Sequence, residues 1–286
     1  MKKIGFIGQG WIGKHYADEF ESRKFSVVRY SLEEPYFNNR ALIADCDIVF
    51  IAVPTPTVPS GFQFGQVENA LTLIGKGKIA VIKSTLLPGT TEILQNKFPG
   101  IYVLHSPEFL VEKTAAFDAA HPKRNIIGIP KDSVDFREQA TAVLRVLPDA
   151  PFNKIMLAKE AEFVKYAGNC YLYTKVLFMN ILHDAVTTQG VDFQKVREGL
   201  INDPRIGESH TQPVFDKGRG AGGHCFIKDF EAFRRYYRDT VATDTAYDLL
   251  TTMMEYNNEL LRKSGKDIDL LEGVYGSGIQ EAERPV

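Results

Sequence analysis

The stretch that decides the fold is KKIGFIGQGWIGKHYADEF, residues 2–20. The short apolar run IGFI predicts a buried strand, and three glycines follow it in the pattern Gly8-x-Gly10-x-x-Gly13 before a helix-competent stretch. A strand, this glycine spacing and a helix in that order are typical of a dinucleotide-binding turn. The first glycine permits the tight turn, the second lets the backbone approach a pyrophosphate, and the third lets the helix pack against the strand.

The predicted helix begins at Trp11 and Ile12, and we expect both residues to take part in cofactor binding. A helix N-terminus offers unpaired N–H groups and the positive end of its dipole to phosphates. The next strand, FSVVRYS, is expected to end near the adenosine ribose, where an acidic residue would indicate NAD. Arg29 stands there instead. It would meet the 2′-phosphate of NADP, stack on adenine, or serve only as a charge at the strand end. The residues of this strand leave the choice between NAD and NADP open.

Further strands alternate with helix-competent stretches, which predicts a doubly wound sheet. ADCDIVFIAV reads as a buried parallel strand, and Pro54 and Thr55 end it at the edge where ligands bind such sheets. Two later strands lead into KSTLLPGTT and SPEFLVE, which place Thr85 and Glu108 at the same edge. Both have a simpler reading, since Ser84 or Thr85 would cap the following segment and Glu108 would favour a helix N-terminus.

The pattern becomes helical from residue 159 onward. Residues 161–190 predict one long apolar-rich helix closed by Gly190. Lys165 and Asn169 lie four residues apart and so share a face of it. Lys165 either extends to solvent or is held in a polar pocket.

We therefore expect an α/β fold with a Rossmann-type sheet followed by an all-helical domain built on this long helix. The predicted boundaries are a cofactor-binding domain at 1–150, a helical domain at 151–264 and a tail at 265–286.

Composition excludes several function classes. The 286 residues carry 34 basic and 36 acidic side chains, so the net charge of −2 gives no general attraction to nucleic acid. No apolar run approaches the length of a membrane span, and the glycine-interrupted N-terminus predicts a buried strand rather than a signal peptide. The three cysteines lack metal-ligand spacing, so we expect free thiols, no metal site and a cytoplasmic protein. Cys46 and Cys170 read as buried hydrophobes, whereas Cys225 follows the glycine-rich loop GRGAGGH.

Seven segments in one order closely resemble the UDP-glucose/GDP-mannose dehydrogenase family, the NAD-dependent nucleotide-sugar 6-dehydrogenases. They are GQGWIG, VPTPT, KSTLLPGTT, SPEFLVE, EFVKYAGN, NDPRIG and GRGAGGHCFIKD. The resemblance runs from residue 1 to roughly residue 262, and its most specific part is the glycine-cysteine stretch with Lys228 and Asp229.

The resemblance implies oxidation of a primary alcohol to an acid by two successive hydride removals. Cys225 would add to the intermediate aldehyde, giving a thiohemiacetal and then a thioester that water opens. Lys165 and Asn169 would stabilise negative charge on the substrate oxygen, and Asp229 would orient its neighbours. The resemblance further implies water activation by Thr85, Glu108 and Glu112, and substrate contacts from Phe109, Leu110, Arg205 and Gly222. It also implies a homodimer.

The sequence departs from the family pattern at several places. Lys113, His224 and Ile227 stand where the family has glycine, serine and proline. The family's C-terminal nucleotide-binding lobe has no counterpart here, so we also consider a catalytically incomplete core that needs a partner protein. Single-step 3-hydroxyacid dehydrogenases share the Lys-x-x-x-Asn helix, and Cys225 in its glycine setting is the feature that separates the two activities.

Overall fold

The computed structural model describes residues 2–216 and 218–277. Contacts between Cα atoms divide it into two compact units. The first contains the residues up to Thr55 together with Gln63–Lys165, and the second contains Pro56–Phe62 together with the residues from Tyr166 on. The domain boundaries drawn from the sequence stay a prediction.

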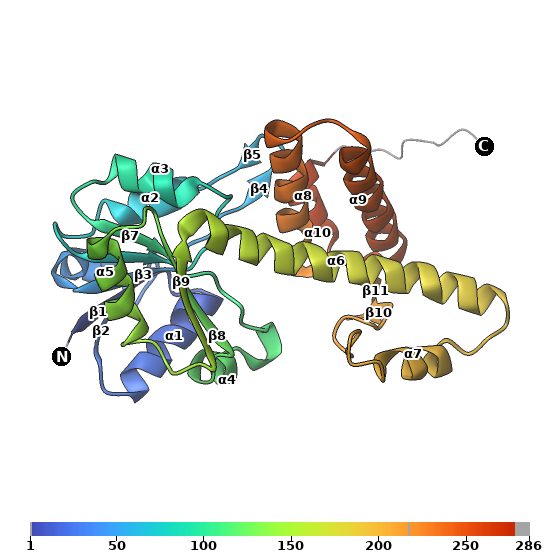
Figure 1. Ribbon diagram of the computed structural model, residues 1–286, viewed down its shortest axis with the longest axis horizontal. Coiled ribbons are helices and arrows are strands. Elements are labelled where there is room, and N and C mark those ends of the chain that lie inside the picture. The colour runs from blue at the N-terminus through green and yellow to red at the C-terminus, as the bar shows by residue number, and fades with distance from the viewer. Residues whose placement is uncertain (1, 217, 278–286) are drawn as a thin grey trace. The chain divides into compact units, whose positions relative to one another are not determined.

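The first unit is built on one sheet flanked by helices (Figure 1). The sheet has seven strands in the spatial order β2-β1-β3-β6-β7-β8-β9. Its strands are β1 (Lys3–Ile7), β2 (Ser26–Tyr30), β3 (Ile48–Ile51), β6 (Ile79–Ile82), β7 (Tyr102–His105), β8 (Arg124–Ile129) and β9 (Phe152–Leu157). The first five run parallel, and β8 pairs with β7 in the antiparallel sense. The order reverses between β1 and β3, and such a reversal creates the crevice in which these sheets bind ligands. The predicted Rossmann-type sheet is confirmed.

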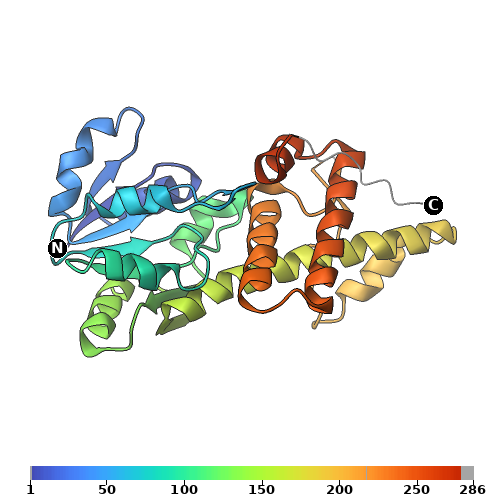
Figure 2. The ribbon, with the colours of Figure 1, turned by 90° about the horizontal axis from the view of Figure 1, so that it is seen from above.

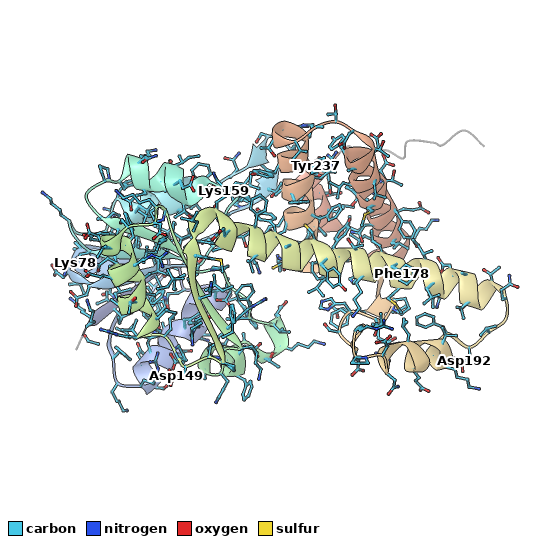
Figure 3. The ribbon with its side chains drawn as sticks, viewed as in Figure 1. Lys78, Asp149, Lys159, Phe178, Asp192 and Tyr237 are labelled. Atoms are coloured by element: carbon cyan, nitrogen blue, oxygen red, sulfur yellow. The ribbon has the colours of Figure 1, made fainter. Side chains whose placement is uncertain are left out.

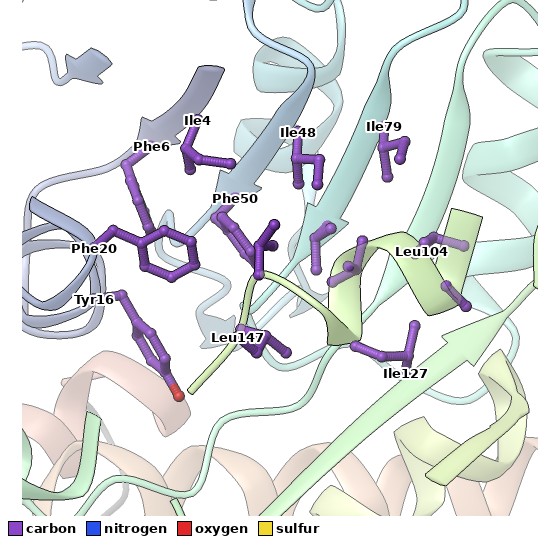
Figure 4. Close-up of a cluster of buried hydrophobic side chains, with 14 of the residues drawn as sticks. Ile4, Phe6, Tyr16, Phe20, Ile48, Phe50, Ile79, Leu104, Ile127 and Leu147 are labelled. Atoms are coloured by element: carbon purple, nitrogen blue, oxygen red, sulfur yellow. The ribbon is translucent and has the colours of Figure 1, made fainter. Parts of the chain in front are cut away.

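Short helices connect these strands. They are α1 (Trp11–Ser22), α2 (Gly65–Leu71), α3 (Thr90–Lys97), α4 (Ala115–Ala120) and α5 (Val134–Leu144), with 3₁₀ turns at Phe37–Asp45 and Glu112–Thr114. The central strands are buried throughout, which explains their continuous apolar sequences. Phe6, Phe20 and Phe50 pack ring against ring in the core, with the Phe6 and Phe50 centroids 5.1 Å apart (Figure 4).

The long helix predicted from the sequence is α6 (Ala158–Thr188), which Figure 2 shows as one continuous rod. Gly190, which the sequence predicts to close this helix, follows it with a φ of +70°. Near its start, α6 is tied to α3 by Glu162, whose carboxylate accepts hydrogen bonds from the Gly89 amide and from the Thr91 amide and hydroxyl. Burial raises the pKa of Glu162 to about 7.

The second unit adds shorter helices to the remainder of α6. They are α7 (Phe193–Ile201), α8 (Gly223–Thr240), α9 (Thr245–Ser264) and α10 (Ile268–Tyr275). Two small antiparallel pairs join them, β4 (Thr57–Val58) with β5 (Gly61–Phe62) and β10 (Val214–Phe215) with β11 (Gly218–Arg219). The β4 strand is fixed to α8 by the Thr57 hydroxyl, which donates to the Lys228 carbonyl. The expected helical domain on a long central helix is confirmed.

Helix α10 lies inside the stretch that we predicted as a tail. Its Leu271 and Val274 are buried with Ile227 of α8 and Leu261 of α9 in one apolar cluster. The part of this stretch around residues 268–275 is therefore folded, because its apolar side chains cover α8 and α9. Residues 278–286 of the predicted tail lie outside the described residues.

Candidate functional site

The three glycines of the N-terminal turn meet different constraints. Gly8 has φ +90°, and a Cβ there would lie 2.4 Å from the Ala52 carbonyl oxygen. A Cβ on Gly13 would lie 1.9 Å from the Gly8 carbonyl oxygen, so the turn closes only with glycine at both positions. A Cβ on Gly10 would meet no protein atom within 4 Å. Protein packing does not require glycine at that position, whereas close approach of a pyrophosphate does.

Helix α1 begins where an anion-binding helix of this fold begins. Gly10 is its N-cap, no side chain caps it, and its first turn contains no acidic residue. Its first backbone N–H groups therefore have no capping side chain and could bind an anion such as a pyrophosphate. Trp11, half exposed at 51%, and the partly buried Ile12 start the helix. These features fit a dinucleotide.

Arg29 at the end of β2 is buried and already paired. Its guanidinium lies 2.7 Å from a carboxylate oxygen of Asp18 and 2.7 Å from one of Glu21, both on α1. Two carboxylates neutralise its charge within the protein. Of the three readings left open by the sequence, this geometry favours a structural charge at the strand end.

The loops after β3 and β6 are joined to each other. The buried Thr55 donates from its hydroxyl to the Thr85 carbonyl at 2.8 Å, and the Ser84 hydroxyl donates to the Val53 carbonyl at 2.6 Å. Helix α3 has Gly89 as its N-cap, so neither Ser84 nor Thr85 caps it. The capping reading of Ser84 and Thr85 is wrong, because these residues bond to the neighbouring loop instead. Pro54 is exposed beside them.

Glu108 belongs to a buried charged cluster after β7. Its carboxylate lies 3.2 Å from the ammonium of Lys83, and the two side chains are only 7% and 4% exposed. Its other oxygen accepts hydrogen bonds from the Phe109 and Leu110 amides, which belong to the loop before the 3₁₀ turn. The capping reading of Glu108 is therefore wrong, because the carboxylate bonds to loop amides and not to a helix N-terminus. Burial and the Glu108 carboxylate raise the pKa of Tyr16, whose ring lies 4.4 Å from the Lys83 ammonium.

The Lys165 side chain bonds to the protein rather than extending freely to solvent. Its ammonium donates to the Glu108 backbone carbonyl at 2.7 Å and lies 5.9 Å from the Phe109 ring centroid. His105 is fully buried nearby, and burial together with Lys83 and Lys165 lowers its pKa to about 3. This imidazole is therefore neutral at physiological pH, so Lys83 and Lys165 provide the positive charge beside Glu108.

A second group of predicted site residues belongs to the helical unit. Cys225 is exposed and is the third residue of α8. One turn along the same helix, Asp229 is buried, accepts a 2.6 Å hydrogen bond from the Asn169 side-chain amide and pairs with the adjacent Lys228. Burial opposes the charge on Lys228, but Asp229 and Cys225 outweigh it and raise the pKa of Lys228.

The other two cysteines differ from Cys225 in their surroundings. Cys46 is fully buried in the first unit, and burial raises its pKa. Cys170 is partly covered in a cluster with Tyr173 and Phe230, and burial followed by the Asp229 charge raises its pKa as well. Both behave as the packed thiols that we expected. Cys225, in contrast, is exposed in the first turn of α8.

The remaining predicted residues have varied positions. Glu112 is exposed on a 3₁₀ turn. Phe109 is partly buried with the Arg124 guanidinium 3.6 Å from its ring centroid, and Leu110 is partly buried beside it. The Arg205 side chain is 87% exposed and pairs with Asp203 of the same turn. Gly222 is the N-cap of α8.

Sequence reasoning missed two side chains, Lys83 and Asp267, that bond to the predicted site residues or to the backbone next to them. Lys83 pairs with Glu108, and a lysine that ends the otherwise apolar strand IAVI was a usable signal for a buried charge. Asp267 accepts a hydrogen bond from the Gly223 amide at the start of α8. Nothing in the local sequence near Asp267 indicates this contact, because it joins residues 44 positions apart.

Two features of the described residues bear on function. Within residues 2–216 and 218–277, no group of three or more His, Cys, Asp or Glu side chains is arranged to hold a metal ion. In the same part of the chain, no helix is both long enough and apolar enough to span a membrane.

The fold and the glycine turn define a Rossmann-type dinucleotide-binding protein with a helical second domain. Residues 32–145 match the NAD-binding domain of the UDP-glucose/GDP-mannose dehydrogenase family, and residues 159–259 match the family's central domain. The chain belongs to this family.

Individual relatives agree with this assignment. A UDP-glucose 6-dehydrogenase of Pseudomonas aeruginosa is 36% identical over 68% of this chain and 45% of its own length. A UDP-glucose dehydrogenase structure from Pyrobaculum islandicum matches with a TM-score of 0.80 and 27% identity, over 95% of this chain and 71% of that one.

Two further facts limit what these similarities show about the chain. The chain spans about half the length of the curated relatives that it matches, 45% and 54% for two of them. A 3-hydroxyisobutyrate dehydrogenase of Mycobacterium tuberculosis matches 96% of this chain and 98% of that one with a TM-score of 0.70. At 15% identity, this last match shows the shared fold alone.

The buried pair of Lys83 and Glu108 predicts a large stability effect. Lys83→Met leaves an unpaired carboxylate in the interior, so the free energy of unfolding falls by about 3–5 kcal/mol. Urea denaturation measures this change. Lys97→Met is the matched control, since the Lys97–Glu68 pair has an exposed lysine and its loss costs at most about 1 kcal/mol. Equal losses in the two variants would contradict the prediction.

Proposed function

We propose that the protein oxidises the primary alcohol of a nucleotide sugar to the carboxylate, with NAD as acceptor and Cys225 as nucleophile. The observation that carries the proposal is the exposed thiol in the first turn of α8, within the family's central domain. A single-step dehydrogenase has no use for a nucleophilic thiol. An aldehyde on the way to an acid must gain a nucleophile at its carbonyl carbon before it can lose a second hydride, and a thiol can be that nucleophile.

The NAD site of the proposal is the N-terminal turn. Gly8, Gly10 and Gly13, with the first turn of α1, would hold the pyrophosphate, and Pro54, Thr55 and Thr85 would lie along the same sheet edge. NAD, when bound, accepts hydride. The choice of NAD over NADP is supported by Arg29, whose charge is neutralised by Asp18 and Glu21 and so is not available to a 2′-phosphate.

In the proposed reaction, the protein residues handle protons and negative charge. The Cys225 thiolate adds to the aldehyde carbon, and Lys165 and Asn169 donate hydrogen bonds to the oxygen that becomes negative. Loss of the second hydride leaves a thioester on Cys225. Glu108, with Thr85 and Glu112, directs a water to the thioester carbon, and the thiolate leaves. Altogether one water is consumed, and two hydrides and three protons are released.

Asp229 supports this scheme without touching the reacting atoms. Its buried carboxylate accepts a hydrogen bond from Asn169 and pairs with Lys228. It thereby orients the amide that faces the substrate oxygen. We assign Phe109, Leu110, Gly222 and Arg205 to substrate contacts, and Arg205 is the residue most exposed for this purpose.

Absorbance at 340 nm, where reduced nicotinamide absorbs, tests the proposal with a panel of UDP-glucose, UDP-N-acetyl sugars and GDP-mannose. The expected result is two reduced cofactors per sugar, with NAD preferred over NADP. Cys225→Ser is expected to abolish the second reduction, while Cys170→Ser, a packed thiol of the same unit, keeps both.

Two other outcomes would contradict the proposal. One reduced cofactor per substrate, unchanged in Cys225→Ser, would indicate a single-step dehydrogenase instead. Cofactor binding by calorimetry without reduction of any sugar in the panel would indicate a core that needs a partner protein.

We also propose that the protein is a homodimer that pairs through α6. Tyr171, Phe178 and Ile181 on this helix are 66%, 56% and 54% exposed, and Figure 3 labels Phe178 on it. Exposed apolar side chains gathered on one helix are typical of an interface. Light scattering at micromolar concentration is expected to give twice the chain mass, and Phe178→Lys with Ile181→Lys to give the mass of one chain. A single-chain mass for the unmodified protein would refute the dimer.

A further inference from the structure

The end of α9 and the turn that leads to α10, residues 264–267, lie against the glycine-rich loop of residues 218–223. Three hydrogen bonds connect them: the Arg219 amide to Ser264 Oγ at 2.9 Å, the Lys266 ammonium to the Gly220 carbonyl at 3.2 Å, and the Gly223 amide to Asp267 Oδ2 at 2.7 Å. We name residues 264–267 the anchoring turn. Loop and anchoring turn both belong to the helical unit, and both lie outside the dinucleotide-binding sheet.

The approach is so close that side chains on the loop would prevent it. A Cβ on Gly222 would lie 1.9 Å from Asp267 Oδ2, and a Cβ on Gly218 would lie 2.7 Å from the Lys266 Cβ. Non-bonded atoms do not approach to such distances, so glycine at these two positions is a condition of the contact. The loop is therefore shaped to receive the anchoring turn.

Asp267 supplies a helix cap that α8 cannot supply from its own sequence. The first N–H groups of any helix have no partner inside it. A Ser, Thr, Asp or Asn at the N-cap normally accepts one of them, but the N-cap of α8 is Gly222, which has no side chain. The carboxylate of Asp267 accepts the Gly223 amide instead. Asp267 itself has φ +53°, a conformation that Asp tolerates better than most residues.

A second side chain holds the loop two residues earlier. Asn257 of α9 is fully buried, accepts the Ala221 amide at 2.7 Å and donates to the Ala221 carbonyl at 3.1 Å. The anchoring turn is fixed in its own right, because α10 buries Leu271 and Val274 against α8 and α9. The backbone before Cys225 is thus held by hydrogen bonds to Asn257 of α9 and to Asp267 of the anchoring turn. Both partners belong to well-packed parts of the chain.

We propose that Asp267 is a positioning residue for Cys225. Its hydrogen bond holds the first turn of α8 in one conformation, and Cys225 is the third residue of that helix. Without the bond the first turn opens, and the sulfur no longer keeps a fixed place. This inference rests on the proposed role of Cys225 as nucleophile, and it assigns a function to a region beyond the predicted helical domain.

Hydrogen exchange tests the anchoring without requiring turnover. In Asp267→Ala, mass spectrometry of the peptides covering residues 218–226 is expected to show exchange about fivefold faster, the ratio that corresponds to the loss of one helix cap. Asp267→Asn keeps an acceptor oxygen and is expected to restore most of the protection. Asp244→Ala is the matched control, because Asp244 caps α9 by accepting the Ala246 and Tyr247 amides and does not touch the loop.

Steady-state kinetics on the full chain then test the positioning. Asp267→Ala is expected to lower kcat by about 10- to 100-fold, the loss expected when a reacting group is misplaced by about 1 Å, with KM changed less than kcat. Asp267→Asn recovers most of kcat, and Asp244→Ala keeps the original value.

The outcomes separate this inference from the proposed function. Unchanged exchange and unchanged kcat in Asp267→Ala, or equal losses in Asp267→Ala and Asp244→Ala, would overturn the positioning role. If the unmodified protein reduces no cofactor, the proposed function fails. In that case, the rate of amide hydrogen exchange in residues 218–226 by itself tests whether Asp267 holds the loop.

Discussion

The placement of Cys225 depends on one constraint, the close packing of a glycine-rich loop against the turn after α9. The loop must pass within hydrogen-bonding distance of Asn257 and Asp267 and then begin a helix. Gly220 and Gly223 have φ of +91° and +77°, values that side-chain-bearing residues rarely adopt. The four glycines among residues 218–223 therefore let side chains from outside the loop hold its backbone by hydrogen bonds. Rigidity comes from these partners, and the glycines make their approach sterically possible.

Buried charges have a related role in the two units. Lys83 with Glu108, and Lys228 with Asp229, are ion pairs with at least one almost fully buried partner. Such pairs contribute little net stability, because the cost of removing both charges from water offsets their attraction. They hold hydrogen-bonding groups in defined orientations, since an unpaired charge in the interior is costly. In each case, one member of the pair accepts a hydrogen bond from a residue that the proposed chemistry uses. Lys165 donates to the Glu108 carbonyl, and Asn169 donates to the Asp229 carboxylate.

Much of the fold could be predicted from local patterns. The apolar run before Gly8 predicted β1, the glycine spacing predicted the turn, and the apolar period predicted α6 to within three residues at its start. What could not be predicted depends on long-range packing. Helix α10, with the sequence IDLLEGVY, falls within the predicted tail, and only its packing against α8 and α9 shows that Leu271 and Val274 belong to an apolar cluster. The partners of Arg29, Glu108 and Lys165 are likewise set by tertiary contacts, so the sequence left several readings of each open.

The central claim is that the Cys225 sulfur is acylated during turnover. The most direct measurement is an acid quench of the protein within the first turnover, with NAD and whichever nucleotide sugar of the panel supports cofactor reduction, followed by peptide mass spectrometry. The account predicts the mass of the oxidised sugar nucleotide, joined as a thioester, on the peptide that contains Cys225 and on no other. Cofactor reduction that proceeds to the acid with Cys225 unmodified at every quench time would contradict the account.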